Sequence, residues 1–204
     1  IATCSRLDAG VSALDFCVSF RLPARFGKEQ LKDYLNKSTP ESLRFRAVVA
    51  KPMAFDAKRT PHRKTYIYGL DNGLDNPLEA RYLWRVGRPL DIPVLEKALA
   101  LFTGLHDFAS FAALDSKSDR TQTFMTEVTS AAVSSKGRGK KILIHIKGKA
   151  FFRYQVRFMV GAAVAAALGK TTLESIAARL ERPDIQSEKY KAPAQGLILY
   201  RTVY

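Results

Sequence analysis

Two short stretches of the chain concentrate positive charge, and aromatic residues lie beside both. The first spans residues 58–64 and the second residues 136–141. Ammonium and guanidinium groups bind phosphates, and aromatic rings stack on unpaired bases, so the combination is typical of RNA-binding proteins. One cluster alone could equally be a solvated loop or a binding site, whereas two beside aromatic residues favour RNA. The predicted RNA-binding residues are Lys58, Arg59, Arg63, Lys64, Lys136, Arg138, Lys140 and Lys141.

A carboxylate near the start of the chain is the other candidate for chemistry. Asp8 opens an Asp-Ala-Gly sequence that lies directly before a strand-like segment. Aspartate bonds to nearby backbone groups and glycine adopts positive φ, so both are common in tight turns. The residue pattern by itself therefore favours a structural turn over a catalytic carboxylate.

The composition excludes several classes of protein. Apolar residues make up 47% of the 204 residues, too many for a disordered or collagen-like chain. A net charge of +14, from 33 Lys and Arg against 19 Asp and Glu, suits a protein that binds a polyanion. The longest run of small apolar residues, 159–169, is shorter than the roughly 20 residues that span a bilayer. We therefore expect a soluble protein with no membrane partner.

Cysteine and histidine offer no pattern for a disulfide framework or a metal site. Cys4 and Cys17 lack the C-x-x-C spacing, so we expect two reduced thiols and a reducing compartment. His62, His106 and His145 share no ligand spacing, and we expect no bound metal.

Hydrophobic periodicity predicts alternating strands and helices. No G-x-G-x-x-G or G-K-[ST] loop joins them, which argues against a nucleotide-binding parallel sheet. We expect an α+β protein with antiparallel sheets and helices on one side. The predicted strands are 15–22, 43–50, 64–70, 81–86, 127–134, 140–148 and 196–204, and the predicted helices are 27–37, 91–103, 151–168 and 172–181.

Five segments, in order along nearly the whole chain, resemble signatures of the TruA-type tRNA pseudouridine synthases. Residues 5–13 resemble G-R-T-D-A-G-V-H-A, and residues 55–68 resemble F-x-A-R followed by R-T-Y-x-Y. Residues 104–111 resemble G-x-H-D-F-x-S-F, and residues 150–161 resemble A-F-L-x-x-M-V-R-x-x-V-G. Residues 192–204 resemble A-P-A-x-G-L-x-L-x-x-V-x-Y. Each motif alone is weak, but their shared order makes the resemblance specific.

The resemblance implies three catalytic residues. Asp8 matches the family's carboxylate, which acts as nucleophile or acid/base partner where the sugar joins the base. Arg157 matches an arginine that holds this carboxylate ionised and oriented. Tyr66 matches a tyrosine that stacks on the uracil and helps to remove the C5 proton. Arg6 is implied to contact the RNA and to hold the target nucleotide out of its stack. Isomerising uridine needs no redox step and no activated group, so no cofactor is expected.

These positions also have structural interpretations. Tyr66 alternates with Tyr68 on a predicted strand, so one of the two could belong to the core. Arg157 could pair with a structural carboxylate elsewhere. His106 and Asp107 are expected to be structural and not a catalytic dyad.

The resemblance further implies a pseudouridine synthase fold, in which two related α/β subdomains meet at a central basic cleft. Residues 1–54 would be the remainder of an N-terminal subdomain with the catalytic aspartate, and residues 55–204 the C-terminal subdomain. The family's first strand and helix lie upstream of its first signature and are missing from this sequence. We therefore expect an incomplete N-terminal sheet. A homodimer that binds one tRNA across two subunits is also implied.

A second function is weighed against the enzyme. Leu7 and Ser12 replace a threonine and a histidine of the family signature. Such changes beside Asp8 suit an RNA-binding factor for ribosome assembly, a component of a ribonucleoprotein that binds ribosomal RNA with little or no catalysis. Retention of Asp8, Tyr66 and Arg157 favours the enzyme. The charge and the absence of an initiator methionine suit a mitochondrial protein, with the nucleus or cytoplasm as alternatives.

Overall fold

The computed structural model describes residues 1–22, 26–73, 76–114, 123–136 and 140–204, which form two compact units. The larger unit contains residues 6–16 and 61–204, and the smaller contains residues 1–5 and 17–60. The segment that carries Asp8 therefore packs with the larger unit, although both of its flanks belong to the smaller one. The division into domains 1–54 and 55–204 stays a prediction.

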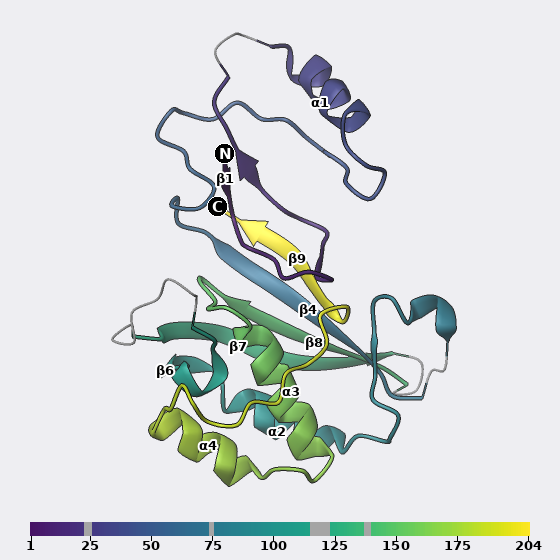
Figure 1. The fold of residues 1–204 in the computed structure, drawn as a ribbon, viewed down its shortest axis with the longest axis vertical. Coiled ribbons are helices and arrows are strands. Elements are labelled where there is room, and N and C mark those ends of the chain that lie inside the picture. Colours follow the sequence, from purple (N-terminus) through teal and green to yellow (C-terminus); the bar gives the residue numbers. More distant parts are fainter. Residues whose placement is uncertain (23–25, 74–75, 115–122, 137–139) are drawn as a thin grey trace. The chain divides into compact units, whose positions relative to one another are not determined.

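The larger unit is a mixed sheet with helices against one face (Figure 1). No helix among the described residues is both long and apolar enough to cross a membrane. The helices are α2 (Ile92–Ala100), α3 (Gln155–Ala167) and α4 (Leu173–Glu181), with short 3-10 turns at Pro77–Glu79 and Ala109–Phe111. The strands are β2 (Ser12–Ala13), β4 (Arg63–Asp71), β5 (Trp84–Arg85), β6 (Gly104–Asp107), β7 (Met125–Lys136), β8 (Lys141–Gly148) and β9 (Leu197–Val203).

The strand order places the start of the chain beside its last strand. The order is β2-β9-β4-β8-β7-β6, with β5 next to one end of β4. Neighbouring strands are antiparallel except for β2 beside β9 and β5 beside β4. Strand β9 thus connects the segment after Asp8 to the middle of the sheet. The expected α+β class with mainly antiparallel strands is confirmed.

Alternation along β4 and β8 builds the core of this sheet. Tyr66 and Tyr68 are buried on β4, opposite the buried Ile146 and Ile144 of β8. Every residue of the alanine-rich helix α3 is buried as well. Small side chains let a helix approach its neighbours closely, so α3 can be surrounded by protein on all sides.

Gly161 lets residues 190–192 cross α3 in direct contact. A Cβ atom at Gly161 would lie 2.0 Å from the carbonyl oxygen of Tyr190 and 3.0 Å from the backbone nitrogen of Ala192. The Ala192 N–H donates a 3.1 Å hydrogen bond to the carbonyl of Arg157, one turn earlier in α3. The missing side chain of Gly161 therefore sets the distance between this segment and the helix.

The smaller unit contains little regular structure. Strand β1 (Ala2–Thr3) pairs antiparallel with β3 (Val18–Ser19), and α1 (Lys28–Lys37) is the helix of this unit within the described residues. Beside the β1–β3 pair, the Cys4 N–H donates a 3.0 Å hydrogen bond to the carbonyl of Cys17, the Cys17 N–H donates one of 3.3 Å to the sulfur of Cys4, and neither cysteine forms a disulfide.

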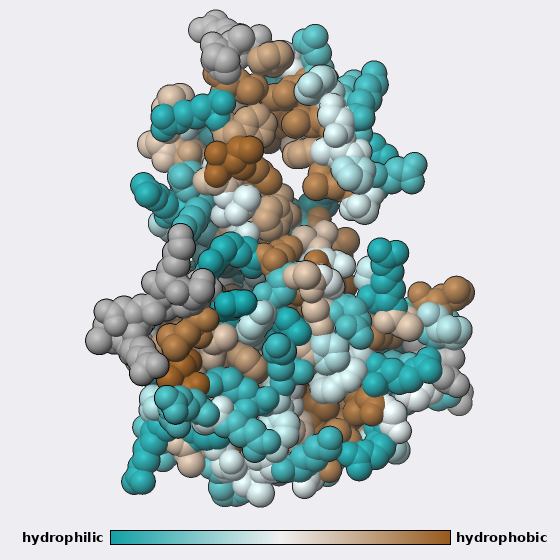
Figure 2. All heavy atoms as spheres, viewed as in Figure 1, coloured by the Kyte–Doolittle hydropathy of each residue, from teal (hydrophilic) through white to brown (hydrophobic). Residues whose placement is uncertain are grey.

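Two predicted strands of this unit are wrong in whole or in part. The strand expected over residues 15–22 is reduced to Val18–Ser19, and residues 43–50 form no strand. A strand needs a hydrogen-bonded neighbour, and the one ladder among the described residues of this unit joins β1 and β3. Leu43 and Val49 are accordingly exposed, by 46% and 64%. Figure 2 shows hydrophobic residues at the surface of this unit.

The remaining expected elements agree with the structure to within a few residues. Helices α1, α2 and α4 lie within the ranges predicted for them, and the β7–β8 hairpin and β9 are present. Asp91 and Thr172 cap α2 and α4 by accepting hydrogen bonds from the N–H groups of Val94 and Ser175. The strand expected over residues 81–86 is shortened to β5, and the helix expected from residue 151 begins at Gln155.

Replacing Gly161 with alanine is expected to destabilise the protein by about 1–3 kcal/mol. The new methyl group would force the Tyr190 backbone away from α3, and this overpacking outweighs the higher helix propensity of alanine. Urea unfolding measures the change. Gly27→Ala is the control, because its Cβ has no neighbour closer than 3.7 Å, and it should cost less than about 1 kcal/mol. Equal costs at the two positions would contradict the close approach at Gly161.

Candidate active site

Asp8 stands at the start of a tight turn that is anchored to the sheet. The Val11 N–H donates a 3.1 Å hydrogen bond to the carbonyl of Asp8, and Gly10 has a φ of +85°. Glycine is the residue that adopts this left-handed conformation without strain. A Cβ at Gly10 would also lie only 3.3 Å from that of Ala194. Both features explain why Asp-Ala-Gly suits this turn.

Pairing with β9 holds the turn in place. Ser12 and Ala13 of β2 lie opposite Ile198 and Leu199 in a parallel ladder. Further along, the Thr202 N–H donates a 2.9 Å hydrogen bond to the carboxylate of Asp15. The position of Asp8 therefore depends on contacts with the last strand of the sheet.

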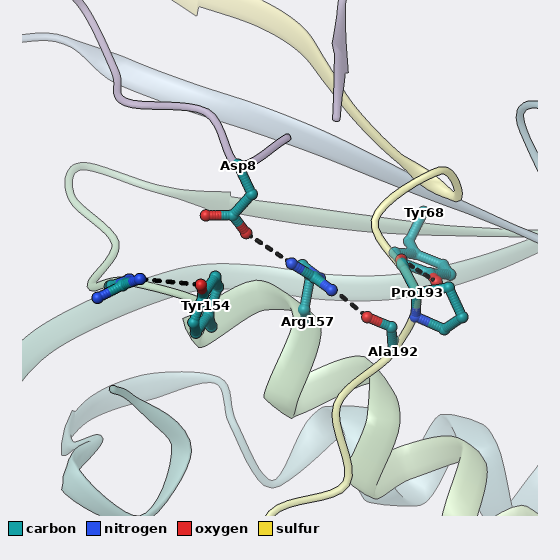
Figure 3. Close-up of polar contacts among 7 residues, drawn as sticks. Asp8, Tyr68, Tyr154, Arg157, Ala192 and Pro193 are labelled. Carbon is teal, nitrogen blue, oxygen red and sulfur yellow. Dashed lines mark hydrogen bonds and ion pairs between the residues drawn. The ribbon is translucent and has the colours of Figure 1, made fainter. Parts of the chain in front are cut away.

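The carboxylate of Asp8 forms an ion pair with Arg157 (Figure 3). The Nη1 of Arg157 lies 2.8 Å from Oδ2 of Asp8, and the two side chains are 10% and 25% exposed. The Nε of Arg157 donates a second 2.8 Å hydrogen bond to the carbonyl of Ala192. Bonds from two sides of one planar guanidinium fix its orientation, and so they fix the carboxylate that it binds. The structure thus brings together two of the three predicted catalytic residues.

The two tyrosines of β4 have different surroundings. Tyr68 is fully buried, and its hydroxyl donates a 2.7 Å hydrogen bond to the carbonyl of Pro193. Burial raises the pKa of Tyr68 well above its ordinary value, and the nearby positive charge of Arg157 opposes this rise. Tyr66 is 5% exposed, and its ring meets Phe151 edge to face with the centroids 5.3 Å apart. Tyr68 is therefore a core residue, and contact between Tyr66 and a substrate stays a prediction.

Sequence reasoning did not predict the left-handed conformation of Tyr154, which directly precedes α3. Its φ is 61°, the one positive value among the described residues other than glycine. Such a conformation costs of order 1–3 kcal/mol in a residue with a side chain, and it is commonest at functional sites. The ring of this tyrosine contacts the nearby Arg153 and Arg157 as well as the distant Lys191, and hydrophobic periodicity does not indicate this conformation.

Three cations surround the Tyr154 ring, and we call the four residues the Tyr154 cluster. The ring centroid lies 4.7 Å from Cζ of Arg153, 5.3 Å from Cζ of Arg157 and 4.7 Å from Nζ of Lys191. Arg153 also donates a 3.0 Å hydrogen bond to the Tyr154 hydroxyl. The electron-rich face of an aromatic ring attracts cations, so the ring holds like charges close together beside the Asp8–Arg157 pair.

Some of the predicted RNA-binding residues are exposed as expected. Arg6 and Arg63 are exposed in the larger unit, next to Asp8 in sequence and at the start of β4, and Lys140 is exposed before β8. Lys58 and Arg59 are exposed in the smaller unit, where their backbone N–H groups bond to the carboxylate of Asp56. RNA binding by each of these residues stays a prediction.

The other predicted RNA-binding residues have different surroundings. Lys64 is only 8% exposed, because the alternation of β4 turns it to the same side as Tyr66. That burial argues against a surface phosphate contact. Lys141 forms an ion pair with Glu79. Lys136 ends β7, and Arg138 lies outside the described residues.

The His106–Asp107 pair has the structural role expected of it. A ring nitrogen of His106 lies 3.1 Å from the carbonyl oxygen of Thr103, and Asp107 accepts a hydrogen bond from the N–H of Ala109. Among the described residues, no group of three or more His, Cys, Asp or Glu side chains is arranged to hold a metal ion.

Comparison with known proteins identifies the family of this chain's relatives. A family model described as tRNA pseudouridine synthase matches residues 98–204. The tRNA pseudouridine synthase A of Mycoplasmoides gallisepticum is 31% identical over 98% of this chain and 73% of its own length. That of Aquifex aeolicus is 31% identical over 100% of this chain and 81% of its own. That of Akkermansia muciniphila is 34% identical over 98% of this chain and 77% of its own.

Tyr68 is expected to make stability fall at alkaline pH. Its pKa is raised in the folded state, so above pH 10 the unfolded state loses this proton while the folded state keeps it. The unfolded state then binds fewer protons, and the free energy of unfolding decreases as pH rises. Tyr68→Phe removes this dependence but leaves the Pro193 carbonyl unpaired, at a cost of about 1–3 kcal/mol at pH 7.

The difference in unfolding free energy between the wild type and Tyr68→Phe should therefore shrink as pH rises from 9 to about 11. Urea unfolding across this range measures it. Tyr34→Phe is the control, because Tyr34 is 67% exposed and should leave the pH dependence unchanged. A constant difference between wild type and Tyr68→Phe would contradict the expectation.

Proposed function

The chain belongs to the tRNA pseudouridine synthase family, and on that premise we propose that it converts uridine in tRNA to pseudouridine. The observation that carries the proposal is the ion pair between Asp8 and Arg157. Its partners are far apart in sequence and meet in a partly buried site of a strongly basic protein. A carboxylate that served only as a turn former would need no arginine held from two sides.

The proposed reaction is an isomerisation with no net change in atoms or electrons. The bond between C1′ of the ribose and N1 of uracil breaks, the base turns, and C5 joins C1′. The hydrogen on C5 leaves as a proton, and N1 gains one. The protein must therefore supply a group that acts at C1′ or on the base, together with a route for one proton.

Asp8 is the group that we assign to the sugar–base junction, as nucleophile or acid/base partner. One of its oxygens is bonded to Arg157, and the side chain is 25% exposed, so the carboxylate is both fixed and accessible. A reacting group held in one orientation gains rate because it needs no reorganisation at the moment of reaction. Arg157 is assigned to the positioning of this carboxylate.

Two further roles follow from the family pattern. Tyr66 would stack on the uracil and help to remove the C5 proton, and Arg6 would hold the target nucleotide out of its stack. Tyr66 lies on β4 opposite Leu199 of β9, the residue that Ala13 of β2 also pairs with. The exposure of Arg6 suits contact with RNA.

The partners and location of the protein are also proposals. We propose tRNA as the substrate and a homodimer as the working form, with a mitochondrial location ahead of the nucleus or cytoplasm. Ribosomal RNA and a ribonucleoprotein assembly belong to the alternative, a factor for ribosome assembly without catalysis. The close Asp8–Arg157 pair favours the enzyme, since a factor that only binds RNA has no need of an oriented carboxylate.

Changing Asp8 to asparagine is expected to abolish catalysis but preserve RNA binding. Asparagine keeps the size of the side chain and can still accept a hydrogen bond from Arg157, but it is neither a nucleophile nor a base. Release of tritium from C5-labelled uridine in tRNA should fall by at least about 10³-fold. The matched control is Asp33→Asn, which removes the same charge from an exposed position on α1 and should leave the rate unchanged.

Two results of this experiment would contradict the proposal. If neither the wild type nor Asp8→Asn releases tritium, and both bind RNA with the same dependence on salt, the protein is an RNA-binding factor. If Asp8→Asn keeps the full rate, the chemistry lies at another residue.

Tyr154 is expected to act as a positioning residue for Arg157. Tyr154→Leu removes the ring that lies 5.3 Å from the guanidinium, whereas Tyr154→Phe keeps it and loses only the hydroxyl. Tyr154→Leu should lower kcat about tenfold or more, Tyr154→Phe should retain most of it, and KM should change little in either. A purely structural role would lower the unfolding free energy of Tyr154→Leu without this selective loss of kcat.

A further inference from the structure

A small pocket with aromatic walls lies within the larger unit, beside the C-terminal half of α3. Its volume is about 150 Å³. Trp84 and Tyr190 form its walls, the buried Gly161 and Ala165 form its floor, and the exposed Lys170 and Lys191 stand at its rim. We call this the Trp84 pocket.

A strand ladder positions one wall of the pocket, and close packing against α3 positions the other. Trp84 pairs with Leu70 in the β5–β4 ladder, and its ring meets that of Tyr68 edge to face, 6.2 Å between centroids. On the other side, Tyr190 is held against Gly161, where its carbonyl occupies the space that a Cβ would need. The Tyr190 hydroxyl lies 3.4 Å from the carbonyl oxygen of Lys170, to which it donates. Both walls of the pocket are thus held by contacts within the larger unit.

The pocket and the candidate active site share one side of α3. Gly161 follows Arg157 by four residues, so the two positions lie on the same face of the helix, roughly 6 Å apart along its axis. Lys191 belongs to both features, since it stands at the pocket rim and its ammonium group lies 4.7 Å from the Tyr154 ring. The edge of the pocket at Gly161 thus lies about one helical turn from the arginine that holds Asp8, and the rest of its lining from α3 lies further along the chain toward Lys170.

We propose that the Trp84 pocket takes one unpaired base of the bound RNA, with an adjoining phosphate on Lys170 and Lys191. The inference rests on the proposed function, and the base concerned is not the uridine that reacts at Asp8. A cavity of about 150 Å³ is the size that holds a single six-membered ring. Aromatic walls bind any base through its flat face, and flanking cations bind the phosphate attached to it.

The charge of the site selects this occupant over a neutral ring. Lys170 and Lys191 line the pocket of a protein whose net charge is +14, so a guest with a negative charge gains an attraction there that an uncharged ring does not. A nucleotide supplies the ring and the negative charge in one unit. It therefore uses the apolar floor, the aromatic walls and the basic rim together.

Fluorescence of Trp84 reports on the pocket directly, because it is the only tryptophan in the chain. We expect a short oligouridylate, which is single-stranded, to change the emission of the 204-residue protein in a saturable way. Ala165→Leu fills the floor of the pocket without changing its charge, and it should weaken oligouridylate binding by about 5- to 100-fold. Circular dichroism and urea unfolding establish that this variant is folded.

Lys170→Ala tests the phosphate contact. It should weaken binding and reduce the slope of log affinity against log salt by about one. The matched control is Lys147→Ala, which removes an equal charge from an exposed position on β8, on the side opposite the buried Ile146. The control should keep the emission change and lose less affinity than Lys170→Ala.

The outcomes separate this inference from the proposed function. The pocket inference is wrong, and the proposed function is unaffected, if the wild type releases tritium from tRNA but RNA does not change the Trp84 emission. The same conclusion follows if Ala165→Leu and Lys170→Ala bind RNA as Lys147→Ala does. If emission responds to uridine 5′-monophosphate but not to oligouridylate, the pocket takes a free nucleotide and the inference is again wrong. If the variants lose RNA affinity as expected but no tritium is released, the pocket binds RNA and the proposed catalysis fails.

Discussion

The guanidinium of Arg157 is the group around which the larger unit is organised. A charge that is only 10% exposed must be paired and fully hydrogen-bonded, or it destabilises the fold by several kcal/mol. Asp8 supplies one partner from a turn 149 residues away, and the carbonyl of Ala192 supplies another. The β2–β9 ladder and the approach of residues 190–192 to α3 each bring one of those partners into reach.

Helix α3 can pack closely against its neighbours because its second half carries few large side chains. Alanines and Gly161 let a neighbouring segment run directly over the helix, and this contact brings the Ala192 carbonyl to Arg157. The start of the helix differs, because the large side chain of Tyr154 lies there in a strained backbone conformation with cations around its ring. The same helix thus combines a tightly packed middle with a strained and charged end.

Periodicity was sufficient to predict most of the larger unit but not its active site. Strand β4 and helix α2 follow from alternation and from the Asp91 cap, which are properties of a few neighbouring residues. The pairing of Asp8 with Arg157 depends on tertiary structure, and only the family resemblance indicated it. Residues 43–50 alternate like a strand but join no ladder among the described residues. The burial of Lys64 and the contact of Lys191 with Tyr154 depend on how distant segments pack, which no local pattern contains.

The position of β9 in the sheet determines when the site can form during synthesis. Strand β9 lies between β2 and β4, and it is made after both. Until residues 197–203 leave the ribosome, the turn that carries Asp8 has no edge on which to dock, and Arg157 has no carboxylate beside it. A partly synthesised chain already carries much of the protein's positive charge, but its candidate active site is not yet assembled. The Asp8–Arg157 pair can therefore form only when the last strand of the sheet is in place.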